Sequence, residues 1–262
     1  MIDAVVFDIG GVFTIRHPTS LRNAMARAGF ALPDDDGIFH AAHYSGVRGL
    51  TEALQHQAGI EADRHFWQHF ERGYFRHLGV AEHDLERAIT AVGQRVYAEE
   101  PKPLWSGLLH ENIAAFHRIC DAGVAVAIVS NNDGTAEQQM IDFGVCQVGD
   151  GPLRRVSIVV DSGTIGIAKP DPAIFLPALE ALGTLAARTL YVGDTVHADV
   201  HGAYAAGMPV VQLDPYGLHA DFDHARAHGV AAIADHLLDH PRAPLRSPSV
   251  SPGTAVVNGL RS

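Results

Sequence analysis

The chain has 262 residues, of which 47% are hydrophobic and 19% are charged, proportions typical of a globular protein with a sizeable core. Its formal net charge of −11 argues against binding to the phosphate backbone of a nucleic acid, which requires a basic surface. A small anionic substrate is not excluded, because the local charge of a cleft matters more than the total charge.

The sequence contains no pattern that indicates export or membrane insertion. The N-terminus runs directly into an apolar strand pattern without a basic segment, and no apolar stretch has the length of a membrane span. Cys120 and Cys146 give neither a disulfide framework nor the spacing of a metal site. We therefore expect a cytoplasmic protein with no membrane partner and no nucleic-acid partner.

The predicted elements place a block of helices inside an α/β pattern. Residues 2–9 form an apolar strand pattern that ends at two glycines. Helical patterns follow, and from about residue 104 strand and helix patterns alternate, as in βαβ units around a parallel sheet. The helical patterns cover residues 21–28, 37–44, 50–57, 66–75 and 85–96.

This order predicts two domains and a tail. Residues 1–15 and 104–240 form the α/β core, and residues 16–103 form a helical cap that is inserted after the first strand. An insertion at that end of the sheet would lie over a ligand site, where a lid is useful. Residues 241–262 are rich in proline and serine and are expected to form a flexible tail.

Polar residues stand at the exits of four apolar runs. Asp8 follows Val5-Val6-Phe7, Ser130 follows residues 126–129, and Asp194 follows residues 190–193. Lys169 comes a few residues after a fourth run. Because ligands of an open α/β sheet bind beyond the carboxyl ends of its strands, we expect these side chains to meet in one crevice.

Each of these residues has a chemical and a structural interpretation. Asp8 is a nucleophile or metal ligand, or an ordinary aspartate at the start of a turn. Ser130 suits a phosphoryl oxygen or caps a helix, and Lys169 balances negative charge or is a solvated surface lysine. Asp194 and Asp199 offer the oxygen ligands that Mg²⁺ prefers, although Asp199 could merely favour a helix N-terminus.

The order of the motifs resembles the haloacid dehalogenase (HAD) superfamily. The resemblance extends over residues 1–240 and is strongest in residues 166–175 and 192–208. It implies a Rossmann-like, doubly wound parallel sheet with an inserted α-helical cap, and a hydrolase with Mg²⁺ as its cofactor. The implied roles are Asp8 as nucleophile, Lys169 as charge-balancing lysine, substrate contacts from Ser130, Asn131, Lys169 and Gly11, and a metal site of Asp8, the Gly10 carbonyl, Asp194 and Asp199.

One position departs from the family pattern. HAD phosphatases usually carry a second aspartate two residues after the nucleophile, and this chain has Gly10 there. General acid–base catalysis is typically worth ~10²–10⁴-fold, so turnover should suffer unless another group moves the proton. His17, His40 and His43 of the cap could supply it, and the sequence does not choose among them.

The predicted function is a phosphatase that acts on a small phosphorylated metabolite through an aspartyl-phosphate. Alternatives are a catalytically weak binding or regulatory protein, and a dehalogenase-type hydrolase, against which the intact Asp194 and Asp199 count. A phosphonate-cleaving relative needs a lysine in the cap, where this chain offers only Lys102 at the edge. A face of the cap could also form a homodimer.

Overall fold

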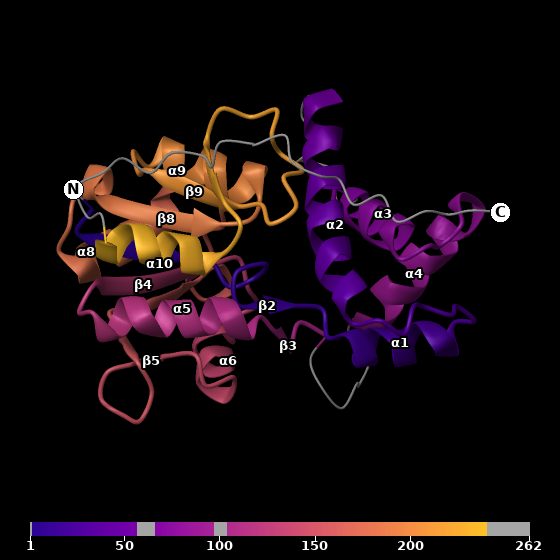
Figure 1. Cartoon of the computed structure of the whole chain (residues 1–262), viewed down its shortest axis with the longest axis horizontal. Helices are drawn as coiled ribbons and strands as arrows, with labels where there is room; N and C mark the ends of the chain where they lie inside the picture. The colour runs from indigo at the N-terminus through magenta and orange to yellow at the C-terminus, as the bar shows by residue number, and fades with distance from the viewer. Residues whose placement is uncertain (1, 57–65, 97–103, 240–262) are drawn as a thin grey trace.

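The computed structural model describes residues 2–56, 66–96 and 104–239. It shows two parts, a central sheet flanked by helices and a group of helices inserted after the first strand (Figure 1). The long helix α2 (Gly37–His56) stands on the side of the helical group that faces the sheet. The predicted tail and Lys102 lie outside the described residues.

A six-stranded parallel sheet forms the centre of the first part. Strand β1 pairs with β4 on one side and with β8 on the other, so Asp8, Ser130 and Asp194 leave three neighbouring strands at the same edge. The strand order is β10 (Ala225–Ala227), β9 (Val210–Leu213), β8 (Thr189–Gly193), β1 (Ala4–Phe7), β4 (Ala125–Ser130) and β7 (Val159–Asp161).

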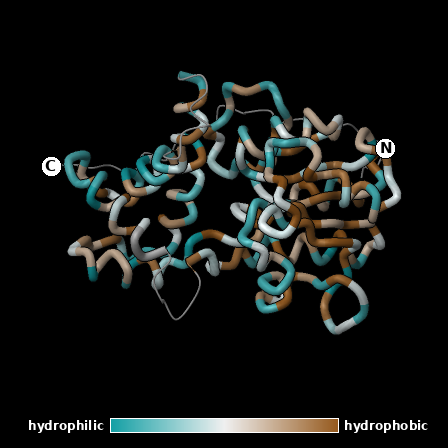
Figure 2. The backbone as a smooth tube through the Cα atoms, turned by 180° about the vertical axis from the view of Figure 1, so that it is seen from behind, coloured by the Kyte–Doolittle hydropathy of each residue, from teal (hydrophilic) through white to brown (hydrophobic). Residues whose placement is uncertain are grey.

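Helices cover both faces of the sheet, which explains the unbroken apolar run of β1. Val5 and Phe7 belong to one core cluster and Val6 to another, because successive side chains of a strand point to opposite faces. Hydrophobic residues concentrate in these strands (Figure 2). One face carries α5 (His110–Asp121) and α10 (Val230–Asp239), and the other carries α8 (Leu176–Leu182) and α9 (Gly202–Ala205). The predicted α/β, doubly wound fold is confirmed.

The inserted helices have a hydrophobic cluster of their own, which includes Leu21, Phe39, Phe75 and Leu85. This cluster is distinct from the two hydrophobic clusters that line the faces of the sheet. The elements of the insert are α1 (Pro18–Arg27), α2, α3 (Gln68–His77), the short 3-10 helix η2 (Glu82–Asp84) and α4 (Leu85–Val96).

The prediction of separate helices at 37–44 and 50–57 is wrong, because α2 is continuous from Gly37 to His56. Gly46 and Gly49 lie between the two predicted ranges and are packing positions within one helix. A Cβ atom added at Gly49 would lie 2.8 Å from the His69 carbonyl oxygen, and one added at Gly73 of α3 would lie 2.4 Å from the Ser45 carbonyl oxygen. Close contact between α2 and α3 therefore compensates for the low helix propensity of glycine.

A short antiparallel ribbon joins the insert to the sheet. Strand β2 (Thr14–Ile15) pairs with β3 (Gly107–Leu108), so the two chain segments that connect the parts run side by side. The remaining elements are α6 (Ala136–Asp142), β5 (Gln147–Val148), β6 (Arg155–Val156), α7 (Ser162–Ile165), η3 (Pro172–Phe175), η4 (Ala186–Arg188) and the π-helix η5 (Val196–His201). Among the described helices, none has the length and apolarity needed to cross a membrane.

Candidate active site

Lys169 lies at the centre of a buried polar cluster at the carboxyl edge of the sheet. Its Nζ donates to Asp199 Oδ1 at 2.7 Å and to the Tyr191 hydroxyl at 2.8 Å. It also lies 2.9 Å from Asp8 Oδ1, within ion-pair distance. With only 2% of its side chain exposed, Lys169 is not a solvated surface lysine. Its ammonium group is placed to balance the charge of Asp8.

Asp199 has both carboxylate oxygens engaged. Oδ1 accepts from Lys169 and from the Tyr191 hydroxyl at 2.8 Å. Oδ2 accepts from the Thr195 backbone N–H at 2.8 Å and from the Thr195 hydroxyl at 2.7 Å. This carboxylate therefore fixes both the lysine and the turn after β8, which is more than a preference for a helix N-terminus.

Tyr191 is a member of the cluster that sequence reasoning missed, because it was treated only as part of a strand. Its ring packs edge-on against Phe175, with ring centroids 5.0 Å apart, and its hydroxyl bridges Lys169 and Asp199. A tyrosine inside the apolar run of residues 190–192 was the available signal, since a buried hydroxyl needs a partner.

Asn131 holds the backbone of Lys169. Its Oδ1 accepts from Lys169 N at 2.8 Å, and its Nδ2 donates to the Lys169 carbonyl at 3.0 Å. The side-chain amide thus positions the lysine, and the predicted contact with substrate stays a prediction. Ser130 is the last residue of β4 and is 4% exposed, one strand away from Asp8.

The turn after Asp8 contains two glycines with different environments. Gly11 has φ of +64°, and a Cβ atom there would lie 2.0 Å from Asp194 Oδ2, so this position requires glycine. At Gly10 an added Cβ atom would meet nothing within 4 Å. There is therefore room at Gly10 for the start of the side chain that the family usually carries.

Asp194 contacts a side chain of the insert. His43 of α2 lies with its Nε2 2.7 Å from Asp194 Oδ2, and both side chains are buried. Among the three candidate histidines, all in the described part of the chain, His43 alone contacts an acid of the cluster. His17 and His40 line a separate cleft of about 1320 Å³ between the insert and helices α5 and α10.

The carboxylates fit a divalent cation. One oxygen from each of Asp8, Asp194 and Asp199 lies within 4.8 Å of the others. When ionised, these three acids carry two more negative charges than the Lys169 ammonium balances. Since buried charge is costly without compensation and carboxylate oxygens suit Mg²⁺, a divalent cation is the ion that this donor set favours.

Burial and repulsion control the pKa values of two of these acids. Burial raises the pKa of Asp8 to about 6, and the charges of Asp199 and Asp194 add to the shift while Lys169 opposes it. Burial, followed by repulsion from Asp199, raises the pKa of Asp194 well above its usual value. Both acids therefore hold a proton more readily than an ordinary aspartate does.

The pKa values of two neighbouring residues, Asp199 and His43, are lowered. Burial alone would raise the pKa of Asp199, but Lys169 and the hydrogen bonds from Thr195 together outweigh it and lower this pKa. Burial, with repulsion from Arg16, lowers the pKa of His43 to about 3. Asp199 is therefore ionised, and the imidazole that faces Asp194 is neutral.

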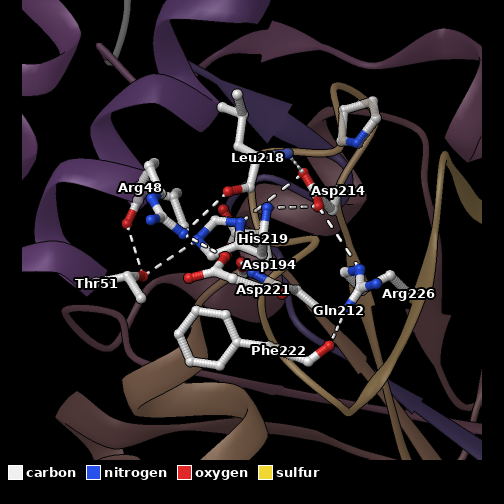
Figure 3. A network of polar contacts seen from close by, with 12 residues as sticks. Arg48, Thr51, Asp194, Gln212, Asp214, Leu218, His219, Asp221, Phe222 and Arg226 are labelled. Atoms are coloured by element: carbon white, nitrogen blue, oxygen red, sulfur yellow. Dashed lines mark hydrogen bonds and ion pairs between the residues drawn. The ribbon is translucent and has the colours of Figure 1, made fainter. Parts of the chain in front are cut away.

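The insert is also tied to the loop between β9 and β10 (Figure 3). Arg48 of α2 donates to the Leu218 carbonyl at 3.0 Å and to Asp221 Oδ1 at 2.7 Å. His219 lies with Nε2 3.2 Å from the Thr51 hydroxyl. At the base of the same loop, Gln212 donates to the Asp194 carbonyl at 2.8 Å, so the loop connects α2 to the backbone of the site.

Two curated phosphatases are similar in sequence to this chain. The chain is 36% identical over 92 residues to a phosphoserine phosphatase of Thermus thermophilus, covering 35% of this chain and 34% of that enzyme. It is 25% identical over 243 residues to a ribulose-1,5-bisphosphate 5-phosphatase of Halopiger xanaduensis, covering 91% and 96% of the two chains. The chain thus spans about a third of the first relative and nearly all of the second.

A solved structure shares the fold. The HAD-hydrolase YfnB of Bacillus subtilis superposes with a TM-score of 0.54 at 16% identity, covering 91% of this chain and 99% of YfnB. The family model for haloacid dehalogenase-like hydrolases matches residues 2–207, which include Asp8, Lys169 and Asp194. The chain is therefore a member of the haloacid dehalogenase-like hydrolase family.

Proposed function

We propose that this hydrolase is a Mg²⁺-dependent phosphatase that acts on a small phosphorylated metabolite through an aspartyl-phosphate at Asp8. The observation that carries the proposal is the buried group of Asp8, Asp194 and Asp199 at the carboxyl edge of the sheet, with Lys169 paired to Asp8 and Asp199. The phosphatase names of the two relatives support phosphoryl transfer as the reaction class.

The metal would be held by the carboxylates of Asp8 and Asp194 and by the Gly10 carbonyl. Asp199 acts through its neighbours, since its oxygens already accept from Lys169 and Thr195. A bound Mg²⁺ supplies electrostatic stabilisation of the charge on the phosphoryl oxygens.

The chain's own groups have separate roles in the reaction. An Asp8 carboxylate oxygen bonds to phosphorus while the bond from phosphorus to the leaving oxygen breaks. Water next attacks the phosphorus of the aspartyl-phosphate, which releases inorganic phosphate and restores Asp8. Lys169 balances the charge of Asp8, and Ser130 positions the transferred group. With glycine at position 10, the leaving oxygen takes its proton from water, and we expect slow turnover.

The test is steady-state release of phosphate from a panel of phosphomonoesters, with Mg²⁺ and with EDTA. We expect activity in wild type that requires the metal, and loss of at least about 10³-fold in Asp8→Asn, since the nucleophile is removed. Asp171→Asn is the matched control, because Asp171 is an exposed carboxylate that caps η3 through Ala173 N at 2.9 Å.

Three results would contradict the proposal. Full activity in Asp8→Asn would exclude this nucleophile. Halide release from a 2-haloacid without metal would indicate the dehalogenase-type reaction. Binding of a phosphate analogue with no hydrolysis that depends on Asp8 would indicate the binding or regulatory protein. Cytoplasmic location and a homodimer through the insert stay predictions.

A further inference from the structure

His43 reaches from the insert to a residue of the candidate metal site. It lies on α2, and its Nε2 is 2.7 Å from Asp194 Oδ2, although 151 positions separate the two residues in the chain. The side chains are 3% and 4% exposed, so water does not share this contact freely. The bond therefore closes the insert directly over one of the three clustered acids.

The rest of the His43 ring packs against aromatic side chains. It packs edge-on against Tyr44, Phe70 and Trp105, with ring centroids 5.1, 5.5 and 5.8 Å apart. Its Nδ1 is buried without a hydrogen-bond partner. Asp194 is thus the polar group that holds the imidazole, and the ring packs among aromatic side chains.

The imidazole and a cation would both use the carboxylate of Asp194. The described atoms close enough to share one ion come from Asp8, Asp194 and Asp199, and His43 is not in that group. The space is also tight, since a Cβ atom at Gly11 would lie 2.0 Å from Asp194 Oδ2 and 2.7 Å from His43 Nε2. Little room is left beside Oδ2 on this side, so a cation that approaches it there displaces His43.

We propose that His43 competes with the divalent metal for Asp194, so that metal binding and closure of α2 over the site oppose each other. This inference rests on the proposed function, since it takes Asp194 as a metal ligand. The effect extends along α2, because the next residue, Tyr44, donates to the Gly11 carbonyl at 2.7 Å beside the Gly10 carbonyl of the same site. His43 acts through Asp194 as a positioning residue.

The chain carries its own reporter for this change. It has two tryptophans, and Trp105 packs against His43 while Trp67 packs against Phe66 and Phe70. In a Trp67→Phe background, fluorescence reports on Trp105 alone. Mg²⁺ and Mn²⁺ are titrated into the full chain, and affinity is measured in parallel by isothermal titration calorimetry.

The decisive variant is His43→Leu, which keeps an apolar side chain against the aromatic rings and removes the bond to Asp194. Since hydrogen bonds to charged groups are among the stronger ones, we expect it to bind metal on the order of ten- to a hundredfold more tightly than wild type. Metal should shift the Trp105 emission of the protein with His43 and leave that of His43→Leu nearly unchanged. His77→Leu is the matched control, because His77 contacts Ser45 within the insert.

Equal metal affinity in wild type and His43→Leu, with no shift in Trp105 emission, would overturn the competition and leave the phosphatase proposal intact. Weaker binding by His43→Leu would overturn it as well, since His43 would then be a ligand. Binding that survives in Asp194→Asn would remove both the metal site and the competition. Absence of binding in wild type together with binding in His43→Leu would support the competition strongly.

Discussion

At Gly10 this chain departs from the pattern of its family, and a single substitution tests what the departure costs. The backbone there has room for a side chain, because an added Cβ atom meets nothing within 4 Å. We expect Gly10→Asp to raise kcat/KM for phosphate esters with poor leaving groups by ~10²-fold, since the new carboxyl can protonate the leaving oxygen. Phosphate release from an alkyl phosphate measures this effect.

An activated ester provides the control for Gly10→Asp. The leaving group of p-nitrophenyl phosphate needs little help from an acid, so the gain with this substrate should be small. Equal gains with both esters would show that the aspartate acts on metal binding or on stability. The absence of any gain, with metal still bound, would mean that another group already donates the proton.

Asp8 should make the stability of the metal-free protein depend on pH. Folding raises its pKa from 3.8 to about 6, so the folded state favours the protonated carboxyl. The resulting stability is complete below pH 3.8 and is lost as the pH rises through about 6. We expect Asp8→Asn, which does not ionise, to have a higher free energy of unfolding at pH 8, by on the order of 2 kcal/mol.

Urea unfolding in EDTA at pH 4 and pH 8 measures this difference. The gain of Asp8→Asn over wild type should shrink toward pH 4, where wild-type Asp8 is protonated. The exposed Asp171→Asn variant should show no gain of this kind. A gain of the same size at both pH values would mean that ionisation of Asp8 is not its cause.

At the scale of elements, the contact between α2 and α3 depends on glycine. A Cβ atom at Gly73 would lie 2.4 Å from the Ser45 carbonyl oxygen and 3.1 Å from Gly46 Cα, both of which are backbone. We expect Gly73→Ala to lower the free energy of unfolding by roughly 1–3 kcal/mol, since α3 must move away from α2. Chemical unfolding followed by circular dichroism measures the loss.

Gly93 on α4 is the matched control, because an added Cβ atom meets nothing within 4 Å there. Gly93→Ala should be neutral or should stabilise the helix by up to about 1 kcal/mol, since alanine has the higher helix propensity. If the two variants behaved alike, the proximity of α3 to α2 would not be what Gly73 provides.

At the scale of the whole molecule, Arg48 joins the insert to the sheet domain. Its guanidinium contacts the Leu218 carbonyl and Asp221, both in the loop between β9 and β10. We expect Arg48→Met to shift the balance toward an open arrangement by about 1 kcal/mol, or roughly fivefold in population, because the site is partly exposed and screened by solvent. Small-angle X-ray scattering should then report a larger radius of gyration.

Arg76→Met is the control for Arg48→Met. Arg76 pairs with Glu82 inside the insert at 2.9 Å, so its loss should leave the radius of gyration unchanged. An unchanged radius in Arg48→Met would show that other contacts, such as that of Tyr44 with the Gly11 carbonyl, are sufficient to hold α2 in place.

The sequence by itself determined the class of the fold and the edge of the sheet where the polar residues gather. Apolar runs of strand length, each followed by Asp8, Ser130 or Asp194, are local patterns, and parallel strands bring their carboxyl ends to one edge whatever the loops do. The helical insert was also predicted from its amphipathic periodicity, although residues 37–44 and 50–57 were predicted as two helices and α2 is one.

Only the tertiary structure decided which side chains meet. The bond from His43 to Asp194 and the bridge from Tyr191 to Lys169 and Asp199 join residues on different elements, and no spacing in the sequence encodes them. A glycine can end a helix or allow a neighbouring helix to pack closely, and which of these occurs depends on what packs against it, as Gly49 and Gly73 show. Such contacts depend on the packing of whole elements, because side-chain direction and close approach are set in three dimensions.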